Sequence, residues 1–109
     1  MITVISAARR SNALTFSDFK RAMQLEHAPL VARFPALHRY VVRYAVEGAS
    51  CPWDVVVELS FPDQAAFQRA LASPEGQRAL EHMRQIIDMS SIQSGVFEEL
   101  ADANAAHAG

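Results

Sequence analysis

The order of strand-like and helix-like segments is the strongest constraint on how this chain can fold. Residues 2–9, ITVISAAR, carry β-branched and small side chains, which is typical of a strand. A helical pattern follows at residues 15–33, and two strand-like segments follow at 37–46 and 53–61. A second helical pattern covers residues 62–87, and a last strand covers 90–100. This βαββαβ order predicts one α+β domain over residues 1–100, a ferredoxin-like sandwich with a four-stranded antiparallel sheet. We expect residues 101–109 to form a disordered tail.

Local signals place the helix ends. Thr15 with Asp18 three residues later forms a capping box, in which the threonine hydroxyl satisfies a free amide at the helix start. Pro29 has no amide proton, so we expect the first helix to break at Ala28 before a short further segment. The stretch Ser73–Glu75 offers a cap, a proline and an acidic first turn, and predicts that the second helical region restarts there.

Both faces of the predicted sheet carry apolar side chains. In residues 53–61 every odd position is apolar, and the even positions are mixed; residues 37–46 behave in the same way. A sheet with helices on one face ordinarily leaves its second face polar. We therefore expect a second copy of the chain to cover this face, giving a homodimer through the sheet faces.

His27 is the first candidate for chemistry. On a helix it lies at the edge of an apolar face, within a stripe of about 80° that also holds Phe16, Phe19, Met23, Leu30 and Phe34. Histidine can give or take a proton near neutral pH. The residues leave two interpretations open: His27 transfers protons in a cleft, or it only hydrogen-bonds the carbonyl group that Pro29 leaves without a partner.

Four further residues are candidates for binding. Tyr40 and Tyr44 lie on one face of their strand, where they either orient an oxygenated ring or pack as amphipathic core. Arg39 and Arg43 lie on the opposite face, where we expect an ion pair with Glu58 or a dimer contact rather than a bound carboxylate.

Composition excludes several classes of protein. A net charge of −2 and a pI near 6.0 argue against a nucleic-acid binder, and the strands lack the basic-glycine-aromatic pattern of RNA-binding modules. No apolar run approaches the roughly 18 residues of a membrane span. Met1 leads directly into a strand-like run rather than a signal peptide, and Cys51, the single cysteine, cannot form an internal disulfide. We therefore expect a cytoplasmic protein.

The histidines show no metal-ligand spacing. His38, His82 and His107 stand at no recognisable interval from His27. We therefore expect no metal and no cofactor.

Four motifs in order resemble the EthD family, named for ethyl tert-butyl ether degradation. They are the first strand ending in Arg9–Arg10, the tetrad His27–Leu30, the strand Asp54–Phe61 and the stretch Ala72–Gly76. The resemblance runs from about residue 1 to residue 100. It implies a dimeric α+β barrel, in which two ferredoxin-like sheets face each other with the helices outside.

The resemblance also implies a function. Similar proteins include methylmuconolactone isomerases, polyketide cyclases, small monooxygenases and proteins encoded beside a cytochrome P450 system; in the isomerase-like ones the histidine matching His27 lies in a cleft. It implies cofactor-free isomerisation, cyclisation or oxidation of a small apolar oxygenated compound, with His27 as acid/base. The alternative is a non-enzymatic ligand-binding accessory protein of an oxygenase system. We expect the cleft to be lined by Phe19, Met23, Leu30, Tyr40, Val57 and Leu59.

Overall fold

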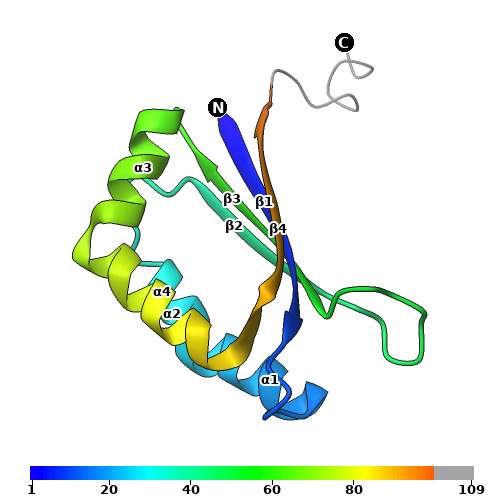
Figure 1. The fold of residues 1–109 in the computed structure, drawn as a ribbon. Coiled ribbons are helices and arrows are strands. Elements are labelled where there is room, and N and C mark those ends of the chain that lie inside the picture. Colours follow the sequence, from blue (N-terminus) through cyan, green and yellow to red (C-terminus); the bar gives the residue numbers. More distant parts are fainter. Residues whose placement is uncertain (100–109) are drawn as a thin grey trace.

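Four antiparallel strands form one sheet, as predicted. They are β1 (Ile2–Arg10), β2 (Arg39–Tyr44), β3 (Val55–Phe61) and β4 (Ile87–Glu98). The computed structural model describes residues 1–99, so the predicted tail lies outside the described residues (Figure 1). β1 pairs with β3 on one side and with β4 on the other, and β2 pairs with β3. The strand order across the sheet is therefore β2-β3-β1-β4.

The helices cover one face of this sheet (Figure 1). None of those in residues 1–99 is long and apolar enough to cross a membrane. They are α1 (Phe16–Ala22), the π-helix η1 (Met23–His27), α2 (Ala28–Val31), α3 (Gln64–Ala72) and α4 (Pro74–Ile86).

The predicted helix caps are present. The Thr15 hydroxyl accepts a hydrogen bond from the Asp18 amide (3.1 Å), and the Ser73 hydroxyl accepts one from the Gly76 amide (3.1 Å). The prediction placed the last strand at Ser90, whereas β4 begins at Ile87. The reason is that the backbone becomes extended at Ile87, directly after α4.

The prediction of a helix break at Ala28 is wrong. The backbone stays right-handed helical from α1 through η1 into α2, and the Ala28 amide donates to the carbonyl of Met23, five residues earlier. A π turn of this kind is wider than an α turn. Because Pro29 has no amide to donate to the preceding turn, a widened turn before it accommodates the proline without interrupting the helix.

The sheet face opposite the helices is partly apolar. Glu58 on this face pairs with Arg43 (3.1 Å between Nη1 and Oε2) and more distantly with Arg39 (3.9 Å), which confirms the predicted ion pair. Phe97 is 54% exposed there. The strand registers place Thr3, Ile5, Ala7, Val41, Val56 and Phe97 on this face.

The core between sheet and helices is divided into two clusters. Met23 and Val55 belong to the first cluster, and Val31 and Phe61 belong to the second. The helical segment and β3 therefore each run from one cluster to the other. His27 lies between Met23 and Val31 on the helical segment, at the point where the packed core is interrupted.

Candidate active site

A cavity of about 400 Å³ occupies the gap between the two core clusters. Its volume is in the range of sites for small organic ligands. A smaller cavity of about 120 Å³ adjoins it and shares several of its wall residues. The wall of the larger cavity is almost entirely apolar, and the polar side chains that residues 1–99 contribute to it are Ser6, His27, Tyr40 and Ser94.

His27 lines both cavities from the helical side. Its side chain is buried, with 7% of the residue exposed. A π turn advances less per residue around the helix axis than an α turn. The π turn of η1 therefore brings His27 back toward the direction of Phe19 and Met23, which explains why a residue predicted at the edge of the apolar stripe lies inside.

Burial sets the protonation state of His27. Loss of solvent, with a smaller contribution from the nearby His82 ring, lowers the pKa of His27 from 6.5 to about 4. The imidazole is therefore neutral at pH 7. A neutral imidazole has one ring nitrogen free to accept a proton, so the site holds a base rather than an acid.

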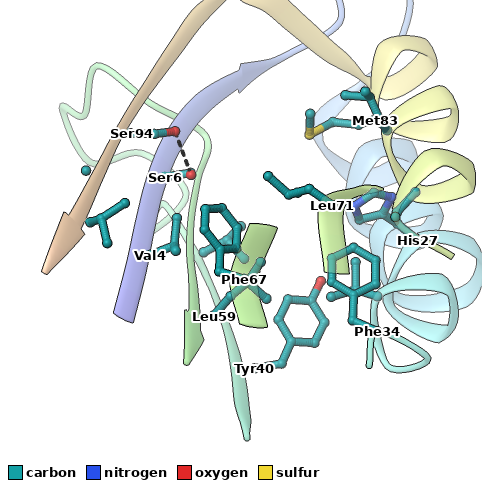
Figure 2. A pocket seen from close by; sticks show the side chains of 17 residues that line it. Val4, Ser6, His27, Phe34, Tyr40, Leu59, Phe67, Leu71, Met83 and Ser94 are labelled. Atoms are coloured by element: carbon teal, nitrogen blue, oxygen red, sulfur yellow. Dashed lines mark hydrogen bonds between the residues drawn. The ribbon is translucent and has the colours of Figure 1, made fainter. Parts of the chain in front are cut away.

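Tyr40 supplies the second functional group. Figure 2 shows its hydroxyl directed into the cavity from the sheet, with His27 on the helical wall. The hydroxyl oxygen is buried and meets no hydrogen-bond partner within residues 1–99. Burial, with a smaller contribution from Tyr44, raises the pKa of Tyr40 to about 12, so it remains a proton donor at neutral pH.

The two serines satisfy each other. Ser6 on β1 and Ser94 on β4 lie opposite in register, and their hydroxyl oxygens are hydrogen-bonded at 2.7 Å (Figure 2). No Asp, Glu, Lys or Arg of residues 1–99 lines the cavity. The site therefore suits an uncharged, mostly apolar molecule with an oxygen atom that can accept the Tyr40 hydrogen bond.

The structure brings together only part of the predicted cleft. His27, Tyr40, Val57 and Leu59 line the larger cavity, and Met23 lines the smaller one. Phe19 is fully buried in the first core cluster instead, with its ring edge-to-face on Tyr44 (6.3 Å between ring centres). Leu30 packs against the second core cluster rather than lining either cavity.

Sequence reasoning missed the contribution of α3 and α4. Both helices place side chains in the cavity wall, among them Phe67, Leu71, Leu80 and Met83. It also missed His82, whose Nδ1 lies 3.0 Å from Nδ1 of His27. The available signal was spacing along α4, because residues 79, 82, 83 and 86 fall on one helix face.

No metal-binding cluster of three or more His, Cys, Asp or Glu side chains occurs within residues 1–99. Cys51 is exposed in the connection between β2 and β3.

The model of the EthD domain family matches residues 11–90 of this chain. No curated protein matches the sequence.

Three solved structures illustrate the likeness of fold. An EthD family protein from Bacillus halodurans C-125 is 18% identical, with a TM-score of 0.78 over 92% of this chain and 99% of that one. A dimeric ferredoxin-like protein of unknown function from Thermobifida fusca is 18% identical, with a TM-score of 0.75 over 90% of each chain. SnoaB, a cofactor-independent oxygenase from Streptomyces nogalater, is 19% identical, with a TM-score of 0.71 over 94% of this chain and 95% of that one. These structures establish the ferredoxin-like fold; the chemistry must be argued from the site.

Proposed function

Because this chain belongs to the EthD family, we propose that it acts on a small, uncharged, mostly apolar oxygenated compound, with His27 as general base. The observation that carries the proposal is that His27 and Tyr40 line the same apolar cavity. A carbonyl oxygen that accepts the Tyr40 hydrogen bond becomes more electron-withdrawing. A neighbouring C–H or O–H proton is then easier for the neutral His27 imidazole to remove.

Removal of that proton is the first step of each reaction in question. An enolate can be reprotonated elsewhere, which is isomerisation, or can attack a second carbonyl group, which is cyclisation. A phenolate or enolate can also give electrons to O₂, which is oxidation without a cofactor. The fold it shares with SnoaB, a cofactor-independent oxygenase, supports keeping oxidation in the proposal.

We further propose that the chain forms a homodimer through the sheet face opposite the helices, and that it works in the cytoplasm. Phe97 and the apolar side chains beside it support a partner on that face. The likeness to a dimeric ferredoxin-like protein supports a second copy as the partner.

The experiment compares proton exchange in wild type and two variants. The probes are a γ-lactone, an aromatic 1,3-diketone and a polycyclic phenol, incubated in D₂O and followed by ¹H NMR, with O₂ consumption measured for the phenol. We expect wild type to accelerate exchange or oxidation of at least one probe. His27→Gln should slow that reaction about 100-fold or more while leaving affinity within a few fold. His38→Gln, at an exposed position on the loop before β2, is the matched control and should behave as wild type.

Tyr40→Phe separates the two cavity groups. We expect it to weaken binding of carbonyl probes and to slow exchange, because the hydrogen bond to the substrate oxygen is lost. Binding of a probe without exchange or oxidation in wild type would instead support the non-enzymatic accessory protein. Failure of every probe to bind would contradict the proposed ligand class.

A further inference from the structure

A second histidine reaches His27 from α4. Nδ1 of His82 lies 3.0 Å from Nδ1 of His27. The two ring planes are inclined by 21°, and the ring centres are 5.2 Å apart. The ring centres are farther apart than the Nδ1 atoms, so the two nitrogens lie between the centres and the rings meet edge to edge rather than face to face, which is the geometry of an N–H···N hydrogen bond.

Glu26 extends this contact toward solvent. Its Oε2 lies 3.4 Å from Nε2 of His82, on the far side of the His82 ring. The side chain of His82 is 16% exposed, whereas that of Glu26 is 65% exposed. The three side chains therefore form a row from the cavity wall to the surface, and the π turn supplies both of its ends.

When both rings are neutral, the chemistry of the three groups determines which atom donates and which accepts in each hydrogen bond of this row. The Glu26 carboxylate only accepts hydrogen bonds, so His82 carries its proton on Nε2. Nδ1 of His82 is then an acceptor, and His27 must donate from its own Nδ1. This arrangement leaves Nε2 of His27 unprotonated.

That free nitrogen is the one available to a ligand in the cavity. His27 lines both cavities, whereas His82 lines neither. Nδ1 of His27 is directed at His82 and away from any ligand, so Nε2 is the nitrogen left for a substrate. An unprotonated Nε2 is the form that a general base requires.

We propose that His82, held by Glu26, is a positioning residue that fixes His27 in the Nδ1–H tautomer and receives its proton during the reaction. The functional part of this inference rests on the proposed role of His27. The tautomer itself is a property of the free protein and can be measured without a substrate.

The proton movements balance without any other reactant. Nε2 of His27 takes a proton from the substrate, whose electron pair stays on the substrate. The Nδ1 proton of His27 can then pass to Nδ1 of His82, which places the positive charge beside the Glu26 carboxylate. The reverse movements return a proton to the product. Among the described residues, Tyr40 is the other titratable side chain in the cavity wall.

The test is ¹⁵N NMR of the full chain labelled at histidine, in mildly alkaline buffer containing EDTA. Two-bond ¹H–¹⁵N couplings report which ring nitrogen carries the proton. We expect Nδ1–H for His27 and Nε2–H for His82 in wild type. His82→Leu should move His27 to the tautomer mixture of a free imidazole, whereas His38→Leu, the matched control at an exposed site, should leave the pattern unchanged.

Two further variants keep the inference testable if His82→Leu does not fold. In His82→Gln the amide oxygen can still accept from Nδ1 of His27, so the tautomer should persist while proton exchange with a bound probe slows roughly tenfold at unchanged affinity. Glu26→Ala, at an exposed position, should release His82 from a single tautomer.

Two results would overturn the inference: an Nε2–H tautomer for His27 in wild type, or an unchanged tautomer in His82→Leu. The proposed function can fail separately. If no probe reacts but the tautomer pattern is as expected, the hydrogen-bonded pair is established and the proposed proton transfer to these probes is contradicted.

Discussion

At the scale of single residues, the site depends on a histidine that burial keeps in its neutral form. The stripe of apolar residues around His27 could be recognised from the sequence and placed this ring at the edge of the apolar face, whereas the structure buries it. Its partner could not be predicted, because His82 is distant in sequence and the contact depends on how α4 packs beside η1. Tyr40 could be assigned to the inner face of its strand, but not identified as a hydroxyl without a partner.

Stability should therefore depend on pH through His27. Burial lowers the pKa of His27 in the folded protein to about 4, whereas an unfolded histidine titrates near its ordinary value of about 6.5. The unfolded chain thus binds this proton first as pH falls. The contribution of neutral His27 to the free energy of unfolding is complete above about pH 6.5 and is lost between about pH 6.5 and 4. It amounts to about 3 kcal/mol in total.

Urea unfolding at a series of pH values measures this effect. We expect the free energy of unfolding of wild type to fall more steeply between neutral pH and about pH 4 than that of His27→Gln. His38→Gln should retain the wild-type slope. Equal slopes in wild type and His27→Gln would show that His27 is not held neutral by the fold.

At the scale of elements, α3 and α4 meet in a tight junction. Ser73 ends one helix and caps the next, since its hydroxyl accepts from the Gly76 amide and donates to the carbonyl of Ala70 (2.6 Å). A Cβ atom on Gly76 would collide with the carbonyl oxygen of Ala70 and lie 2.6 Å from that of Leu71. Glycine is thus required by the close approach of two backbones.

Gly76→Ala should consequently destabilise the protein by about 3 kcal/mol or more, because the obstructing atoms are backbone and cannot rotate away. Gly48→Ala is the comparison. Gly48 has a φ of 83° but open space around its Cβ position, so only about 1 kcal/mol is expected there. Thermal and urea denaturation would give both values, and an equal cost for the two variants would contradict the packing argument.

The elements themselves could be read from the sequence, since alternation in β3 and the caps at Thr15 and Ser73 are local signals. The π turn could not be predicted from the sequence. Proline signals that a helix is perturbed, but whether the chain breaks, bends or widens depends on what the surrounding core accepts.

At the scale of the whole molecule, the proposed dimer can be tested through Phe97. This side chain is 54% exposed on the face away from the cavity, so Phe97→Asp should leave the monomer folded while placing a charge in the proposed interface. Leu25→Asp, at a 70% exposed position on η1, is the matched control.

Light scattering after size-exclusion chromatography should give a dimer for wild type and Leu25→Asp, and a monomer for Phe97→Asp with an unchanged circular dichroism spectrum. A monomeric wild type would overturn the proposed assembly. The prediction of a second copy came from apolar residues on both sheet faces, a pattern that says a face is covered without saying in which orientation.

The π turn at Met23–His27 has a meaning in terms of chain length. A helix that makes one wider turn holds one residue more than a regular helix between the same two ends, so this segment has the form of a single-residue insertion into an α-helix. Because the extra residue is absorbed within one turn, α1 and α2 can keep their packing on either side. A chain one residue shorter here could retain the same sheet and helices, yet it would turn Glu26 and His27 away from His82. The loss of one codon could therefore remove the site while leaving the fold intact.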